Sequence, residues 1–253
     1  MKFKTLALTS AISSALLMTS FTSVAQELEI TVSNLTHGIF FTPLLVAAHD
    51  TNTFAFHSGT EASTELATLA EGGNPAPLKT LLDNANANTV ANPVAAEAAA
   101  GTIDELANGD PGFLAPGAST SLVLSTDDAN NRLSFAAMLL PTNDGFVGID
   151  SWKIPTEAGT YSINLNAYDA GTEANDEIIV NDSGALGVAG IPGCPGGRCG
   201  TGASGVTSVE ENNKVHIHRN TLGDSDDQGG VSDLSNTAHR WLNPVARITI
   251  TVK

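Results

Sequence analysis

Four carboxylates lie close together where a strand-like run gives way to a loop: Asp169, Glu173, Asp176 and Glu177. Gly171 stands among them, and no basic residue is nearby. Carboxylates crowded in this way either form a solvated acidic loop or hold a cation, and hard divalent cations prefer oxygen ligands. The stretch by itself leaves both interpretations open.

A further carboxylate, Asp144, lies in a turn that is rich in Pro, Asn and Gly. Three strand-like segments surround these sites in chain order: 132–140, 146–154 and 159–168. If they form an antiparallel meander, the turn with Asp144 and the loop with Asp169 and Glu173 lie at the same end. Three carboxylates, with backbone carbonyls and water, fit the 6–8 oxygen ligands that Ca²⁺ takes. Gly171 would let the loop turn so that both of its acids face one ion.

Two histidines, His216 and His218, are spaced to lie on one face of a strand, since side chains repeat every two residues. Imidazoles in this arrangement suit zinc or copper, and a carboxylate base beside a zinc-bound water would complete an active site. A secreted metal-dependent enzyme is therefore the alternative function. The simpler interpretation is a strand whose polar face carries histidine.

Two other motifs are weaker. The segment 224–230, DSDDQGG, has acids and a glycine at EF-hand positions, but Gln228 and Ser235 replace the fifth and twelfth ligands. It is interpreted as an acidic turn, with cation binding as the alternative. Cys194 and Cys199, in GCPGGRCG, predict a small disulfide loop, because no histidine lies within the loop to complete a zinc site.

The N-terminus predicts a signal peptide over residues 1–25. Lys2 and Lys4 precede an apolar stretch, and small residues precede a cleavage point after Ala25. No later segment approaches about 20 continuous apolar residues, so no transmembrane segment is expected. The predicted location is secreted or periplasmic.

The charge balance restricts the partners. The formal net charge is −16, and it becomes −18 without the leader, which removes Lys2, Lys4 and no acid. Nucleic acid is excluded as an expected partner, because phosphate binding needs a basic surface.

Strand patterns recur along the rest of the chain and predict one all-β domain over 26–253. The expected strands are 28–35, 119–126, 132–140, 146–154, 159–168, 214–220 and 246–253. The first and last of these are expected to pair. Two excursions interrupt the strands: a helical and irregular insertion at 60–118, and a Gly/Pro-rich loop insertion at 181–212. Within the first, helices are expected at 60–73, with Thr60 as N-cap and Gly72 as stop, and at 77–85, with Pro77 in the first turn.

Four blocks of sequence, taken together, resemble the spondin N-terminal domain of F-spondin and mindin, in a single-domain secreted form of the bacterial type. The blocks are FTPLLVAAHD (41–50), GTEASTELATLAEGG (59–73), PTNDGFVGID (141–150) and YDAGTEAND (168–176). The resemblance implies a C2-like antiparallel β-sandwich that binds one Ca²⁺ at a loop end. It places the metal ligands at Asp144, Asp169 and Glu173. This chain departs from the family pattern at Gly145, where the family has Trp, and at Glu173, where it has Asp.

The function expected from these observations is a secreted, calcium-binding, non-enzymatic binding or adhesion module. Its partner would be an extracellular protein or glycan. Within the acidic loop, Asp169 is expected to matter most for the metal, followed by Glu173. Asp176 and Glu177 are expected to be solvated.

Overall fold

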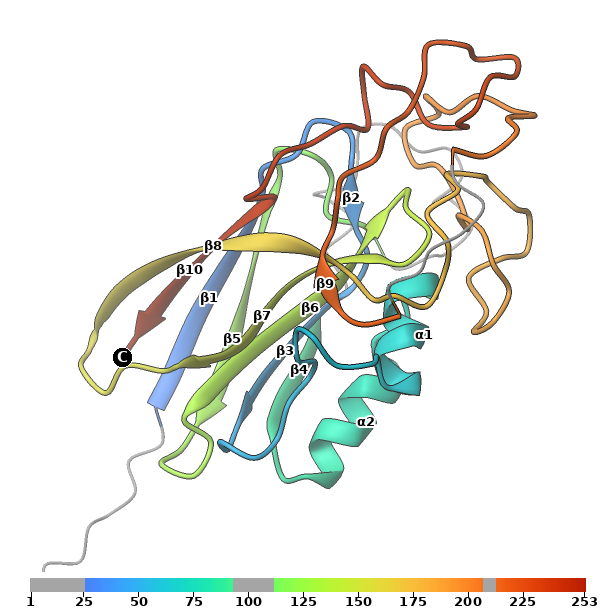
Figure 1. The fold of residues 1–253 in the computed structure, drawn as a ribbon. Helices are drawn as coiled ribbons and strands as arrows, with labels where there is room; N and C mark the ends of the chain where they lie inside the picture. The colour runs from blue at the N-terminus through green and yellow to red at the C-terminus, as the bar shows by residue number, and fades with distance from the viewer. Residues whose placement is uncertain (1–25, 93–111, 207–212) are drawn as a thin grey trace, which may run out of the picture.

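The fold is an all-β antiparallel sandwich with two short helices on one side (Figure 1). The computed structural model describes residues 26–92, 112–206 and 213–253, so the predicted signal peptide 1–25 lies outside the described residues, as do parts of both predicted insertions. The strands are β1 (Gln26–Asn34), β2 (Phe40–Phe41), β3 (Leu44–His49), β4 (Asn88–Asn92), β5 (Ser119–Thr126), β6 (Arg132–Leu140), β7 (Gly145–Lys153), β8 (Gly159–Asp169), β9 (His216–Ile217) and β10 (Ala246–Val252). The helices are α1 (Thr64–Gly72) and α2 (Ala76–Asn84).

One long strand, β8, belongs to both layers of the sandwich. Its first part pairs with β10, as far as Leu165, and its last part, from Asn166 to Asp169, pairs with β7. The strand order is β4-β3-β6-β7-β8-β10-β1-β5, with β2 on β6 and β9 on the end of β8. The last residues of β8 therefore pair with β7 on one side and with β9 on the other.

The predicted pairing of the first and last strands is confirmed. β1 and β10 are antiparallel, with Ile30 opposite Ile250. The apolar residues that alternate along both strands are buried, as the period of two requires. Together with Phe41 and Phe135 from the other layer, they form the main core between the two layers.

The two helices cover the outer face of β3, β6 and β7. Leu66, Leu78 and Leu82 are buried there against residues that include Phe146. Helix α1 begins later than predicted, because Ser63 and not Thr60 is its N-cap: the Ser63 Oγ accepts the N–H of Leu66 at 3.1 Å. The other end is also shifted by one residue, to the left-handed C-cap Gly73, whereas Pro77 lies in the first turn of α2 as expected.

Three strands, β2, β3 and β4, were not predicted, and one predicted strand was too long. β3 and β4 pair with each other, although the segment of β4 was expected to be irregular. In the segment 214–220, only His216 and Ile217 form a strand, paired with Asp169 and Tyr168 at the end of β8. The histidines therefore lie at the same end of the sandwich as the acidic loop.

Candidate metal centre

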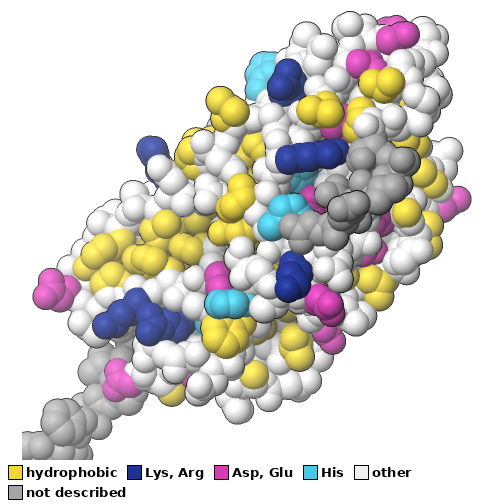
Figure 2. Space-filling view, viewed as in Figure 1, with side chains coloured by type: hydrophobic (Ala, Val, Ile, Leu, Met, Phe, Trp, Pro, Cys, Tyr) yellow, Lys and Arg dark blue, Asp and Glu magenta, His cyan; other side chains and the backbone are white. Residues whose placement is uncertain are grey.

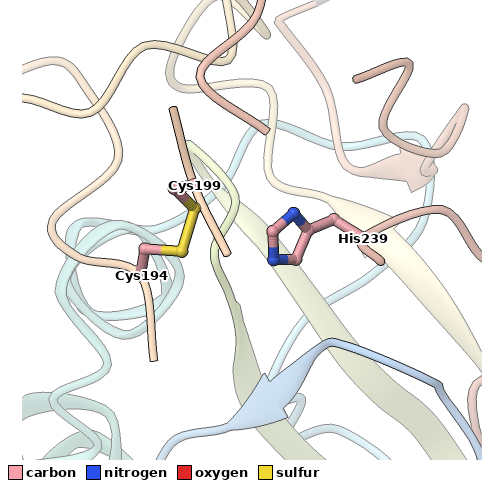
Figure 3. Close-up of side chains that lie close together, drawn as sticks. All are labelled: Cys194, Cys199 and His239. Atoms are coloured by element: carbon pink, nitrogen blue, oxygen red, sulfur yellow. A yellow bond between two sulfur atoms is a disulfide. The ribbon is translucent and has the colours of Figure 1, made fainter. Parts of the chain in front are cut away.

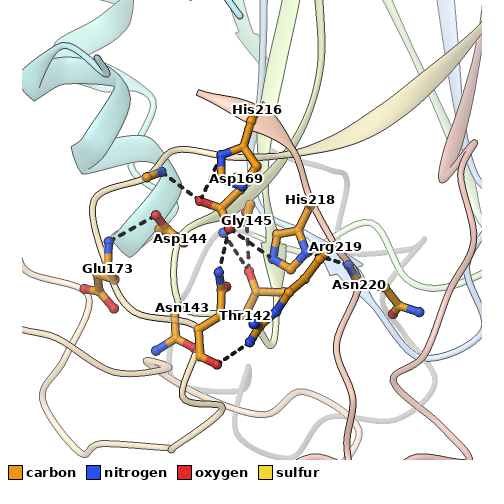
Figure 4. Close-up of polar contacts among 12 residues, drawn as sticks. Thr142, Asn143, Asp144, Gly145, Asp169, Glu173, His216, His218, Arg219 and Asn220 are labelled. Atoms are coloured by element: carbon orange, nitrogen blue, oxygen red, sulfur yellow. Dashed lines mark hydrogen bonds and ion pairs between the residues drawn. The ribbon is translucent and has the colours of Figure 1, made fainter. Parts of the chain in front are cut away.

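The meander of β6, β7 and β8 brings the two acidic loops together, as predicted. Gly145, at the start of β7, lies opposite Asp169, at the end of β8. The N–H of Ala170 donates to the carbonyl of Asp144 at 3.2 Å, which joins the two loops directly. Asp144, Asp169 and Glu173 are consequently neighbours at one end of the sandwich (Figure 4).

Asp144 is completely buried, and its two oxygens have different surroundings. Oδ2 accepts hydrogen bonds from the N–H of Thr172 at 2.8 Å, the hydroxyl of Thr172 at 3.2 Å and the N–H of Glu173 at 3.1 Å. Oδ1 is buried and has no hydrogen-bond partner. The acidic loop thus orients the carboxylate through one oxygen and leaves the other without a donor.

Asp169 is also completely buried and is held by its own loop. Its Oδ1 accepts the N–H of Gly171 at 2.8 Å, and its Oδ2 accepts the side-chain amide of Asn175 at 2.6 Å. Gly171 has a φ of +72°, and a Cβ at this position would lie 2.6 Å from the backbone nitrogen of Lys214. The tight turn that brings Asp169 and Glu173 together therefore requires glycine.

Glu173 shows the same division between its two oxygens as Asp144. Its Oε2 accepts the N–H of Gly190, from the Gly/Pro-rich insertion, at 2.9 Å. Its Oε1 is buried without a hydrogen-bond partner. Two of the three predicted ligands thus carry a buried oxygen that no protein donor satisfies.

The electrostatic cost of this arrangement appears in the pKa values. Burial, with the Asp169 carboxylate beside it, raises the pKa of Asp144 to about 7. Burial also raises the pKa of Glu173 to about 7, with smaller contributions from Glu71 and Asp144. Both groups therefore favour an added proton or a bound cation near neutral pH.

The oxygens of Asp144, Asp169 and Glu173 do not all lie close enough together to bind one ion at the same time. Three ligand atoms on one ion lie within about 5 Å of one another, since Ca²⁺–oxygen distances are about 2.3–2.6 Å. Among the described residues, only Cys194, Cys199 and His239 have ligand atoms that all lie within 4.8 Å of one another. Binding through Asp144, Asp169 and Glu173 together thus requires a side chain to rotate, and Glu173 has the longest of the three.

The comparisons with known proteins concern the region that holds these loops. The family model of the spondin N-terminal domain, Spondin_N, matches residues 34–182, which is more than half of the chain. The chain belongs to the spondin N-terminal domain family. No curated protein matches it. The match includes all three carboxylates and ends before the disulfide, His216, His218 and β10.

Membership of this family and the disulfide together indicate an extracellular type of domain. The S–S bond between Cys194 and Cys199 confirms the predicted loop. In the part of the chain that the structure describes, no helix has the length and apolar character needed to cross a membrane.

Gly145, where the family pattern has Trp, is enclosed by other side chains in this spondin domain. A Cβ at Gly145 would lie 2.7 Å from the Thr142 hydroxyl and 3.1 Å from the His218 ring. The ring of His218 packs against Trp241, with centroids 5.2 Å apart. Aromatic groups still stand beside the Asp144 loop, but they come from a distant part of the chain.

His216 and His218 both face Asp169, at 3.9 and 4.0 Å from its carboxylate oxygens. In His218, Nδ1 accepts the N–H of Asn220 at 2.9 Å, so the ring proton is on Nε2. This Nε2–H is buried and has no hydrogen-bond partner. Burial lowers the pKa of His218 to about 3, with a smaller contribution from Arg219. His218 is thus a neutral donor that faces Asp169, and it would have to change tautomer to bind a metal.

The expectation that Asp176 and Glu177 are solvated is wrong for Glu177. Glu177 is 2% exposed, and its carboxylate accepts the N–H groups of Leu222 and Gly223 and the hydroxyl of Ser232. Asp176 is partly buried and accepts the side-chain amide of Asn143 at 2.9 Å. Sequence reasoning missed these roles because the donors to Glu177 lie at least 45 residues further along the chain.

The acidic turn at 224–230 is held by its own carboxylate. Asp224 accepts the backbone N–H groups of Asp226, Val231 and Ser232. These bonds lower the pKa of Asp224, since they favour its charged form. Bonds of this kind are those of an acidic turn, which was the favoured interpretation.

The cysteine loop has a histidine neighbour that its sequence does not indicate. His239 lies beside the disulfide (Figure 3), and the ligand atoms of Cys194, Cys199 and His239 lie within 4.8 Å of one another. Both sulfurs are used in the disulfide, so they are not thiolate ligands in this state.

Proposed function

We propose that this protein is an extracellular, non-enzymatic binding module whose spondin domain binds one Ca²⁺ through Asp144, Asp169 and Glu173. The observation that carries this proposal is the pair of buried carboxylate oxygens without donors, Asp144 Oδ1 and Glu173 Oε1. A buried charge without a partner is costly, and a divalent cation with oxygen ligands removes that cost. Backbone carbonyls and water would complete the coordination.

Bound Ca²⁺ would act on the loops and not on a reaction. Asp144 precedes β7, Asp169 ends β8, and Glu173 reaches the Gly/Pro-rich insertion through its bond to Gly190. An ion held by all three would therefore connect three segments at one end of the sandwich. The ordered loop surface is the proposed contact for an extracellular protein or glycan, which is an adhesion-type role.

Nucleic acid is not proposed as a partner. The formal net charge is −16, whereas nucleic-acid binding needs a continuous basic surface. Figure 2 shows the Lys and Arg side chains of one face in separate places, with no continuous basic area.

Melting temperature in excess EGTA and then in excess CaCl₂ tests the calcium proposal. A ligand at 100 times its dissociation constant adds about 2.7 kcal/mol of stability. For a domain of this size, about 1 kcal/mol corresponds to about 2–4 °C, so an increase of about 5–10 °C is expected. No change between the two conditions would contradict the proposal.

Metal analysis of protein purified without a His tag separates the calcium module from the alternative enzyme. Stoichiometric calcium supports the proposal. Stoichiometric zinc or copper would instead support a site at His216 and His218. A change of tautomer in His218 would then be required, with loss of its bond to Asn220.

A further inference from the structure

A cavity of about 230 Å³ lies beside the disulfide loop, and none of the three carboxylates lines it. Its apolar wall includes Phe40, Pro116 and Pro195. Its polar wall consists of His37, Arg198 and His239. No described acidic residue lines this basic cavity, although the chain has 27 acidic residues against 11 Lys and Arg.

His239 lines the basic cavity and supplies it with an N–H donor. The residue is 1% exposed, and its Nδ1 accepts the N–H of Ser235 at 3.0 Å. The ring proton is therefore on Nε2, and this N–H makes no hydrogen bond to any residue that the structure describes. Burial, helped by the charge of Arg198, lowers the pKa of His239 to about 4, so the ring is a neutral donor at pH 7.

Arg198 supplies the positive charge. It is exposed and directly precedes Cys199, so the disulfide to Cys194 fixes the short loop that carries it. Within the described part of the chain, its guanidinium forms no ion pair. A guanidinium binds carboxylate and sulfate groups through two parallel N–H bonds.

We infer that the basic cavity binds a small organic oxyanion, a carboxylate or a sulfate ester, with its charged group on Arg198 and His239. The apolar part of the ligand would contact Phe40 and the two prolines. Exposed His37 would provide a further donor at the rim. This site is independent of the proposed calcium site, since it uses none of the three carboxylates. Four of its lining residues, Pro195, Gly196, Arg198 and His239, also lie outside the spondin family match.

Chemical-shift titration of the whole protein, after removal of calcium with EGTA and of the EGTA by dialysis, tests this inference. The probes are benzoate, phenyl sulfate and benzamide, the last being a neutral analogue of benzoate. We expect saturable shifts with at least one anion, confined to residues around 37–40, 115–116, 195–199 and 239. Benzamide should bind about tenfold more weakly or worse, since it cannot form the charged pair. Tighter binding of benzoate identifies a carboxylate ligand, and tighter binding of phenyl sulfate identifies a sulfate ester.

Two exposed arginines give a matched pair of variants. Arg198→Gln should weaken binding of the preferred anion about tenfold or more. Arg247→Gln, on β10, removes the same charge away from the cavity and should leave binding within about twofold. The inference is overturned if neither anion gives a saturable shift, if benzamide binds as well as the anions, or if the two variants have equal effects.

Discussion

Asp144→Asn should stabilise the calcium-free protein at neutral pH, although it replaces a completely buried residue. The pKa of Asp144 rises from an ordinary 3.8 to about 7 on burial in the folded protein. Each pKa unit is worth about 1.4 kcal/mol, so the buried charge costs up to about 4 kcal/mol. Asparagine removes this charge, and its oxygen can still accept the donors from Thr172 and Glu173.

The expected gain is smaller than the full cost, because the side-chain amide of asparagine is itself a buried polar group. We expect Asp144→Asn to raise the unfolding free energy in EGTA at pH 7.5 by about 1–3 kcal/mol. We also expect CaCl₂ to add no stability to this variant, since the buried oxygen that faces the ion is lost. Denaturant unfolding, with and without calcium, measures both effects.

Asp128→Asn is the matched control. Asp128 is exposed in the turn after β5, so its substitution should change stability by less than about 0.5 kcal/mol and leave the calcium effect intact. The reasoning is refuted if Asp144→Asn destabilises the protein in EGTA while calcium still adds its full stabilisation.

Three further outcomes are expected. The apparent calcium affinity should rise about tenfold or more from pH 6 to pH 8, because carboxyls with a pKa of about 7 must lose their protons before they bind the ion. Titration calorimetry measures this affinity, and an affinity that does not change with pH would contradict the proposed ligands. In the same assay, Asp169→Asn should weaken binding most, Glu173→Gln less and Asp176→Asn least, and equal effects of the first and last would contradict the assigned ligands. Glu177→Gln should lower the unfolding free energy by about 1–3 kcal/mol equally in EGTA and in calcium, because it disturbs three hydrogen bonds to a buried carboxylate. A loss seen only in calcium would instead make Glu177 a ligand.

The stability of the calcium-free protein should also depend on pH, with two opposite effects. The raised pKa values of Asp144 and Glu173 give stability that is present below about pH 4 and is lost as the pH rises through about 7. The lowered pKa values of His218 and His239 act the other way, since their contribution is lost as the pH falls below about 6.5.

The sequence predicted those strands and turns whose own residues form a recognisable pattern. Alternating apolar residues identified β1 and β10, and turn residues located the loop with Asp144. By contrast, β3 is buried at all six positions, so the period of two is absent. β4 was missed because Asn88 and Asn92 bound a short segment of low strand propensity.

For the site, the sequence predicted which loops come together but not the contacts that distant segments make with them. Counting strand ends placed Asp144 and Asp169 at one end of the sandwich, because an antiparallel meander alternates direction. The roles of Glu177 and His239 depend on contacts with segments far along the chain, and no local spacing encodes such contacts. One oxygen of Asp144 accepts hydrogen bonds and the other accepts none, and this difference likewise depends on the three-dimensional structure.

The antiparallel pairing of β1 with β10 has a mechanical consequence. Leu28 lies opposite Val252, and Lys253 bonds to Glu27 and Glu29 at the same end. A pulling force applied at Gln26 and Lys253 would therefore act across the inter-strand hydrogen bonds and break them one after another. Tethered through these two points, the domain would unzip at low force. A tether through the loop end and one of these points would instead load the strands along their length.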